Sequence, residues 1–230
     1  MLGTFLNVAG VLGGTLTGRC VPRALPEARQ LQARRILTGL TLLTGVVVIT
    51  SALSPQIGVS LKLGLVALTA LCLGSLTGHL LGLHRLLGRA VAWAGTRNAG
   101  PSGFPLEVVV LVANPLGFVG AVLEGWTGDW RPLGLKAALD TLAALGFAAA
   151  GSRTVWLAAL PMLAVQGTLT LGAALLVQRF PDPASAAALR LCAGLIVVAA
   201  TPVVLGLRKV PLANYLPSLV LGPLLAAWWF

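Results

Sequence analysis

Two side chains of opposite charge lie one helical turn apart inside a stretch that is otherwise almost entirely apolar. Lys136 and Asp140 are four residues apart within residues 132–150, so a helix over this range brings them to one face. Because a charge among apolar surroundings is costly, such residues are candidates for function. We expect the Asp140 carboxylate to bind a proton or another coupling cation. The alternative is a self-neutralising pair in which Lys136 extends its ammonium group toward water.

Polar groups near helix-breaking residues form a second set of candidates. They are the amides and hydroxyls of Asn114, Gln166, Thr168 and Thr170. A proline follows Asn114 directly and another lies five residues before Gln166, so we expect broken helices there, as in transporter sites near the middle of a bilayer. These groups would line a solute cavity, although helix–helix contact is the competing interpretation for Gln166 and, more strongly, for the two threonines. Asn7 is a weaker candidate, and Glu107 and Glu124 are expected to be solvated at helix ends.

The sequence lacks the residue patterns of common catalytic and cofactor sites. It contains no HExxH motif, no GxSxG motif and no phosphate-binding glycine loop. The three cysteines, Cys20, Cys72 and Cys192, lie far apart and form no CxxC, so neither a metal site nor a disulfide framework is indicated. We therefore predict that the chain is not an enzyme and that it binds no cofactor or metal.

The composition indicates a membrane protein built from helices. The 230 residues are 57% hydrophobic and 10% charged, whereas ordinary globular chains are ~45–50% apolar and ~25% charged. A helix that crosses the bilayer needs about 20 mostly apolar residues. We predict an all-α, polytopic transmembrane helix bundle that forms one integral membrane domain over residues 1–230. The eight expected helices span residues 2–18, 35–53, 61–83, 105–123, 132–150, 154–177, 187–207 and 212–230.

Basic residues gather in alternate gaps between these expected helices. With the N-terminus outside, the cytoplasmic gaps hold 11 of the 16 Lys and Arg residues, in agreement with the positive-inside rule. The same pattern favours a C-terminus outside. It also explains the net charge of +10 better than nucleic-acid binding, which requires a basic face on a folded domain. We expect the lipid bilayer and a small solute or ion as partners, and no nucleic acid.

Two parts of the chain resemble each other at nearly constant spacing. Residues 14–18 resemble residues 167–171, and residues 33–40 resemble residues 188–195. This relates expected helices 1–3, in about 1–83, to helices 6–8, in about 154–230, and leaves central helices in about 105–150. Because related helices are an odd number apart, the copies would run in opposite directions, as in the inverted-topology repeats of many transporters. Chance similarity in a chain rich in Leu, Gly, Thr and Ala is the alternative.

Several short motifs together resemble the YdfK/YqgA-like family of bacterial membrane proteins, which is the domain-of-unknown-function family 554. The motifs are Thr127-Gly128-Asp129, Lys136, Leu139-Asp140, Gln166-Gly167, Leu169-Thr170-Leu171, Arg208-Lys209 and Asn214-Tyr215-Leu216-Pro217. The stretch Ala113-Asn114-Pro115-Leu116 departs from the family pattern, which puts a carried-over role for residues 105–123 in doubt. The resemblance implies a location in the bacterial inner (cytoplasmic) membrane and points to Lys136, Asp140 and Gln166. It implies no substrate.

A secondary transporter for a small solute or ion, working by alternating access, is the function that these features favour. Asp140 would be the coupling site, and Asn114, Gln166, Thr168 and Thr170 would line the cavity. A passive channel and a non-transporting scaffold or regulatory membrane protein remain as alternatives. Gly10, Gly14 and Gly18 form a small-residue face on the first helix, a pattern compatible with a homodimer.

Overall fold

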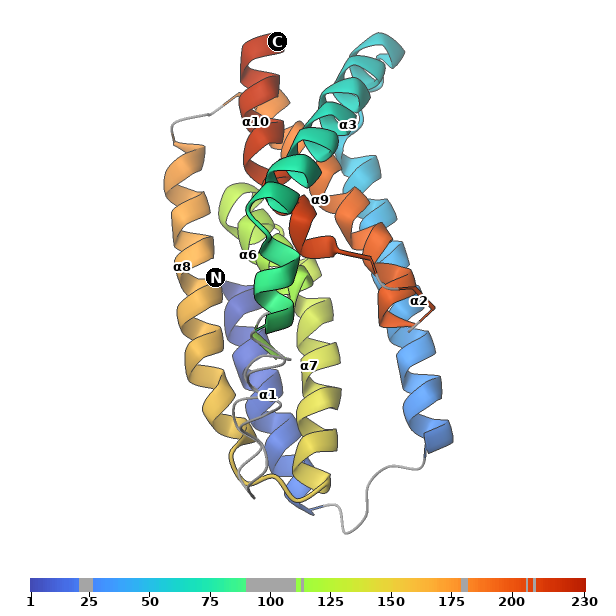
Figure 1. The fold of residues 1–230 in the computed structure, drawn as a ribbon, viewed down its shortest axis with the longest axis vertical. Helices are drawn as coiled ribbons and strands as arrows, with labels where there is room; N and C mark the ends of the chain where they lie inside the picture. Colours follow the sequence, from blue (N-terminus) through green and yellow to red (C-terminus); the bar gives the residue numbers. More distant parts are fainter. Residues whose placement is uncertain (21–26, 90–110, 113, 179–181, 206, 209) are drawn as a thin grey trace.

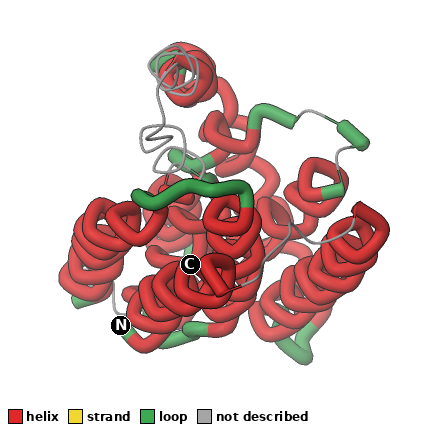
Figure 2. The backbone as a smooth tube through the Cα atoms, turned by 90° about the horizontal axis from the view of Figure 1, so that it is seen from below, coloured by secondary structure: helices red, strands yellow, loops and turns green. Residues whose placement is uncertain are grey.

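The computed structural model describes residues 1–20, 27–89, 111–112, 114–178, 182–205, 207–208 and 210–230, and every regular element in these ranges is helical (Figures 1 and 2). The all-α prediction is therefore confirmed for this part of the chain. The elements are α1 (Leu2–Cys20), α2 (Glu27–Ala52), α3 (Ile57–Leu80), α6 (Pro115–Thr127), α7 (Arg131–Ala149), η1 (Val155–Ala158), α8 (Ala159–Val177), α9 (Pro183–Val204), η2 (Leu212–Tyr215) and α10 (Ser218–Trp229).

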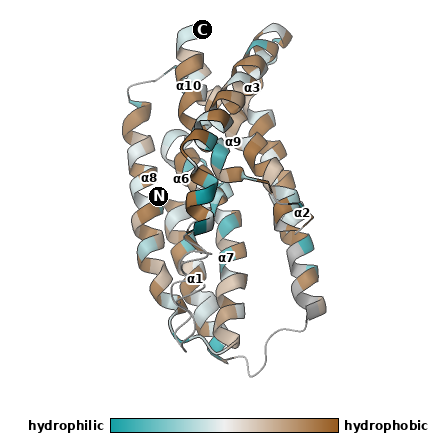
Figure 3. Cartoon of the chain, viewed as in Figure 1, coloured by the Kyte–Doolittle hydropathy of each residue, from teal (hydrophilic) through white to brown (hydrophobic). Residues whose placement is uncertain are grey.

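Five stretches in the described part of the chain are long and apolar enough to cross a membrane. They are Arg35–Ala52, Ile57–Leu80, Arg131–Ala149, Val155–Val177 and Pro183–Val203. The helices α1, α6 and α10 are not among them, so eight crossings remain a prediction. Large apolar side chains face outward on α3 and α8, where Leu61 is 67% and Leu175 is 68% exposed. Figure 3 shows hydrophobic residues along both helices, as expected for surfaces in contact with lipid.

The helix α6 is short because its two ends are determined by local sequence. Asn114 caps its start, where its side-chain oxygen accepts a hydrogen bond from Leu116 N at 3.1 Å, and Pro115 occupies the first helical position. Gly128 ends it with a φ of 73°, a conformation that glycine adopts without strain. Within the helix expected over 105–123, residues 111–112 are also helical and Asn114 has an extended backbone (φ −71°, ψ 125°), so the break that we expected at Asn114-Pro115 is confirmed. Residues 105–110 and 113 of that prediction, including Glu107, lie outside the described residues.

The helix α8 is continuous past Gln166, so the break that we expected there is wrong. It begins at Ala159 and continues through Gly167 to Val177. Pro161 lies in its first turn, where a helix has backbone N–H groups without partners in any case. The proline therefore interrupts no hydrogen bond in the middle of the helix.

The small-residue face of α1 packs against α7. A Cβ at Gly10 or Gly14 would collide with Thr141, and one at Gly18 would lie 2.5 Å from the Leu145 carbonyl oxygen. Only glycine allows two helices to approach so closely. The face that we considered for a homodimer is therefore occupied within the chain, and a dimer would have to use another surface.

The described helices form two groups around two buried apolar clusters. One cluster includes Val11, Ala144, Val155 and Met162 and belongs to α1, α7, η1 and α8. The larger cluster lies among α2, α3, α6, α9, η2 and α10 and also includes Ala173 of α8. Figure 1 shows α1 and α7 in the half of the molecule opposite the C-terminus, with α6 at the level where the two groups meet.

Candidate functional site

The predicted charged pair is closed and lies inside the protein. On α7, the Lys136 ammonium donates a hydrogen bond to Asp140 Oδ2, and the two side chains are 0% and 5% exposed. The same ammonium donates to the Leu111 carbonyl oxygen at 2.8 Å. The expected pairing is thus present, but the idea that Lys136 extends toward water is wrong. Two full charges are held among apolar helices, where their mutual attraction offsets part of the cost of desolvation.

A glycine of α6 makes room for this pair. A Cβ at Gly117 would lie 2.8 Å from Lys136 Cε and 3.1 Å from Gln166 Nε2. The side chains of α7 and α8 therefore converge on one bare patch of the α6 backbone. The two side chains that meet there are Lys136 and Gln166. Each carries a hydrogen-bond donor, an ammonium group on Lys136 and an amide NH2 group on Gln166.

An amide from α1 completes this group of polar side chains. Asn7 Nδ2 donates to Gln166 Oε1 at 3.2 Å, and the Asn7 side chain also approaches the Asp140 carboxylate. Both amides are buried, with Asn7 0% and Gln166 1% exposed. We refer to Asn7, Lys136, Asp140 and Gln166 as the ion-pair cluster. Asn7 had been only a weak candidate in the sequence.

Two polar atoms of the ion-pair cluster have no hydrogen-bond partner among the residues that the structure describes. These are the acceptor Asn7 Oδ1 and the donor Gln166 Nε2. If the oxygen and nitrogen positions of both amides were exchanged, the two amides would still be hydrogen-bonded to each other. One donor and one acceptor would again have no partner. Buried polar atoms are nearly always paired, so each exception calls for an explanation. A ligand that binds here is one such explanation.

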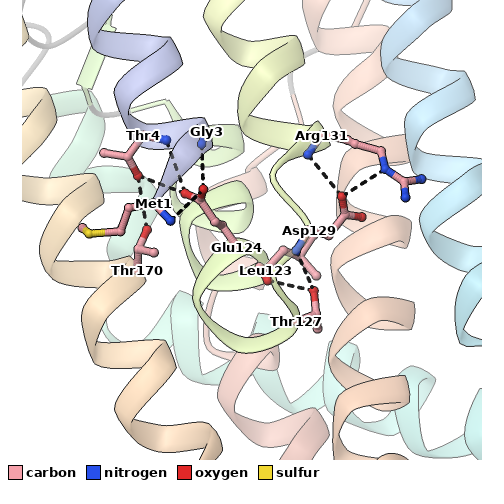
Figure 4. Close-up of polar contacts among 9 residues, drawn as sticks. All are labelled: Met1, Gly3, Thr4, Leu123, Glu124, Thr127, Asp129, Arg131 and Thr170. Carbon is pink, nitrogen blue, oxygen red and sulfur yellow. Dashed lines mark hydrogen bonds and ion pairs between the residues drawn. The ribbon is translucent and has the colours of Figure 1, made fainter.

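A second buried group of polar side chains centres on Glu124, which the sequence led us to place in solvent. Figure 4 shows its carboxylate reaching from α6 to the first turn of α1. Glu124 Oε1 accepts from Gly3 N at 2.6 Å and lies 3.0 Å from the Met1 ammonium. Its Oε2 accepts from Thr4 N at 3.3 Å and from Thr4 Oγ1 at 3.1 Å. The residue is 5% exposed, so the expectation of a solvated helix end is wrong.

Thr170 joins this second group, which we call the Glu124 cluster. Its Oγ1 lies 3.4 Å from Thr4 Oγ1, and either hydroxyl can be the donor. Thr4 is one turn from Asn7 on α1, and Thr170 is one turn from Gln166 on α8. The two clusters are therefore neighbours along the same interface between α1 and α8. Placing a negative carboxylate at the start of α1 is favourable, because a helix N-terminus carries partial positive charge.

The structure does not bring all the predicted cavity residues together. Thr168 is exposed on the outer face of α8, and its hydroxyl donates to the carbonyl oxygens of Ala164 and Val165. Its prediction as a cavity residue is wrong for this conformation, because it points away from both clusters. Asn114 is half-buried and caps α6, where it positions the helix that carries Gly117.

The surface offers a contrast to these buried groups. Asp129 follows α6 and pairs with Arg131 at 3.4 Å, but the two side chains are 22% and 65% exposed. Within the described ranges, no three His, Cys, Asp or Glu side chains come close enough to hold a metal ion. The chemistry available to the ion-pair cluster is therefore that of an ammonium, a carboxylate and two amides, which can bind and release polar ligands.

Comparison with known proteins gives a family but no characterised relative. A family model described as "Protein of unknown function (DUF554)" matches residues 2–227. The sequence is 31% identical over 247 residues to "Uncharacterized protein YqgA" of Escherichia coli (strain K12), with 100% of this chain and 99% of that protein covered. No solved structure matches the chain. The matched region includes the residues of both clusters. Neither the family description nor the name of the relative states an activity.

Proposed function

The chain belongs to the DUF554 family, and we propose that it is a multi-pass protein of the bacterial inner membrane that transports a small solute or ion. The transport is secondary, works by alternating access and uses Asp140 as the coupling site. The observation that carries this proposal is the fully buried Lys136–Asp140 pair with unpaired amide atoms beside it. Charged residues inside membrane helices are costly and commonly mark the paths of ions and substrates.

The directions of the helices support an inverted repeat, which is part of the proposal. Contacts between Thr4 and Thr170 and between Asn7 and Gln166 make α1 and α8 antiparallel. The pair α3 and α10 is also antiparallel, because Lys62 meets Trp229 near one end and Gly74 meets Ser218 near the other. These are the helix pairs that the repeat relates, and an inverted repeat requires opposite directions.

Two further helix pairs fit the same relation. Gly10 and Gly18 of α1 contact successive parts of α7 in the same order, so these helices are parallel. Gly117 and Gly125 of α6 likewise meet Gln166 and Thr170 of α8 in the same order. A two-fold axis that exchanges α1 with α8 and α7 with α6 would relate these two parallel pairs. An N-terminus and C-terminus outside, as the positive residues favour, belong to this proposal.

Alternating access would involve the contact between α1 and α8. The α1–α7 contact is made largely by backbone and small residues, so these two helices are suited to move as one body. The α1–α8 contact is made by hydroxyls and amides, whose hydrogen bonds can change partners at modest cost. A shift along this interface would open the ion-pair cluster toward one side of the membrane and then the other.

The experiment is solute uptake into proteoliposomes that contain the purified protein. A panel of radiolabelled polar solutes is tested with imposed proton and sodium gradients. We expect gradient-dependent, saturable uptake of at least one solute, and its loss in the double variant Lys136→Gln/Asp140→Asn. This double variant removes both charges and so leaves neither one buried without a partner. Asp129→Asn is the matched control, because that carboxylate lies at the surface.

The outcomes separate transport from the alternatives. Uptake that persists in the double variant would remove the charged pair from the mechanism. A current proportional to voltage, with no saturation and no need for a gradient, would assign the protein as a channel. Absence of any flux from correctly folded protein, judged by size-exclusion chromatography, would favour a scaffold or regulatory role.

A further inference from the structure

The ion-pair cluster carries no net charge, and this restricts what can bind there. Its ammonium and carboxylate are matched one to one, with amides as the other members. A ligand with net charge would leave one uncompensated charge in the interior, which is far more costly than a matched pair. A ligand that is neutral overall, and that carries both signs, avoids this cost.

The unpaired amide atoms require a ligand that both donates and accepts hydrogen bonds. Asn7 Oδ1 needs a donor and Gln166 Nε2 needs an acceptor. A metal cation would leave Gln166 Nε2 without a partner, and a simple anion would leave Asn7 Oδ1 without one. Neither single ion therefore satisfies the cluster.

Groups of the same kind also lie near each other in the cluster. Lys136 Cε and Gln166 Nε2 approach the same point above Gly117, which places two donor side chains together. The Asn7 side chain approaches the Asp140 carboxylate through its NH2 donor, so the unpaired acceptor Oδ1 belongs to the same amide group that contacts the negative side chain. The cluster thus has a half that suits an anionic group and a half that suits an ammonium group.

We infer that the ligand of the ion-pair cluster is a small zwitterion of the amino-acid type. Its carboxylate accepts from Lys136 Nζ and Gln166 Nε2, and its ammonium donates to Asp140 and Asn7 Oδ1. The ligand enters in place of the Lys136–Asp140 contact, so one internal ion pair becomes two and no charge is left alone. This inference rests on the proposed transport function and names its substrate class.

Ligand-dependent thermal stability of the detergent-purified protein tests the inference. The zwitterionic probes are glycine, L-alanine and γ-aminobutyrate, which differ in size and in the separation of their charges. Methylammonium chloride and potassium acetate supply each charge alone, and acetamide supplies a neutral donor and acceptor. We expect a saturable rise in Tm of about 5–10 °C at a hundredfold excess over Kd for at least one zwitterion. Equal concentrations of the single ions should give no shift.

Two variants localise the response, and a third is the control. Gly117→Ala places a methyl group against Lys136 and Gln166 Nε2 and should abolish the shift, as should Gln166→Leu, which removes the unpaired donor. Thr168→Val lies two residues from Gln166 but on the outer face of α8 and should keep the full shift. Each variant is compared with its own ligand-free Tm, so a loss of folding is measured separately from a loss of binding.

The outcomes also distinguish this inference from the proposed function. Stabilisation by methylammonium or acetate alone, or no response to any zwitterion, would overturn the zwitterion assignment. If ion flux that depends on Lys136 and Asp140 is then still seen in proteoliposomes, transport stands and only the substrate class is wrong. If no flux depends on the pair, both proposals fail.

Discussion

Replacing Gly14 with alanine would force apart two helices that touch through their backbones. A Cβ at this position would lie 3.0 Å from the Thr141 carbonyl carbon, 3.1 Å from Thr141 Cα and closer still to the carbonyl oxygen. These atoms belong to the α7 backbone, so no side-chain rotation relieves the overlap. Overpacking of this kind costs about 1–3 kcal/mol. The strain would be felt at the polar interface too, because α1 also carries Thr4 and Asn7.

The adjacent Gly13 provides a matched control, because no atom of the described ranges lies within 4 Å of the Cβ that alanine would add there. Alanine gains about 1 kcal/mol of helix propensity over glycine at either position, and this gain cancels when the two variants are compared. We expect the free energy of unfolding of Gly14→Ala to be lower than that of Gly13→Ala by about 1–3 kcal/mol.

Reversible unfolding in mixed detergent micelles, followed by circular dichroism, measures this difference. Both variants add one methyl group to the same helix, so detergent affinity and helix content are closely matched. Equal stability of the two variants, or greater stability of Gly14→Ala, would refute the described packing of α1 on α7.

Three further predictions concern the buried polar groups and the ends of α6. Lys136→Gln or Asp140→Asn alone should lower the free energy of unfolding by about 3–5 kcal/mol, because each leaves a buried charge unpaired. The double variant should lose clearly less than the sum of the two in the same unfolding assay, and simple additivity would contradict a closed pair. Glu124→Gln should cost about 1.5–3 kcal/mol through lost charge-assisted hydrogen bonds, whereas Asp129→Asn should stay within about 0.5 kcal/mol; equal costs would place Glu124 in solvent. Asn114→Ala should cost about 1 kcal/mol as a lost helix cap, and an unchanged midpoint of chemical unfolding would argue against that cap.

The burial and pairing of Lys136 and Asp140 could be predicted because the information is local. Their four-residue spacing defines a shared helix face, and the apolar residues around them indicate an interior location. The length of the Lys136 side chain suggested that its ammonium could reach water. It does not, because the Leu111 carbonyl, contributed by a distant part of the chain, accepts a hydrogen bond from it.

The Glu124 cluster could not be predicted from the neighbourhood of Glu124 alone. The glutamate lies near the end of α6, next to polar and glycine residues that are typical of a turn. Its burial depends on the start of α1, which lies 120 residues away in the sequence and docks beside it. A usable signal was present on α1 itself, where Thr4 and Asn7 share the glycine-bearing face. Polar groups on a face that packs closely must find partners inside the protein.

The error at Thr168 could have been avoided by helical geometry. Gln166 and Thr170 are four residues apart and share a face, whereas Thr168 is about 200° around the helix from Gln166 at 3.6 residues per turn. The expected break in α8 obscured this, because residues beyond a break need not follow one helical period. The proline lies at the start of the helix instead, and the regular period applies throughout.

The long separation between α1 and its partners has a consequence for how the protein is made. A ribosome adds about 5–20 residues per second, so Glu124 emerges roughly 6–24 s after the first turn of α1, from which it is 121 residues distant. Throughout that interval the nascent first helix lacks the partners of Thr4 and Asn7, and its glycines have no neighbouring backbone to meet. Gln166 and Thr170 arrive later still. The interior of this protein is therefore assembled near the end of synthesis, and a chain that stops before α8 would leave its earliest helix without its polar contacts.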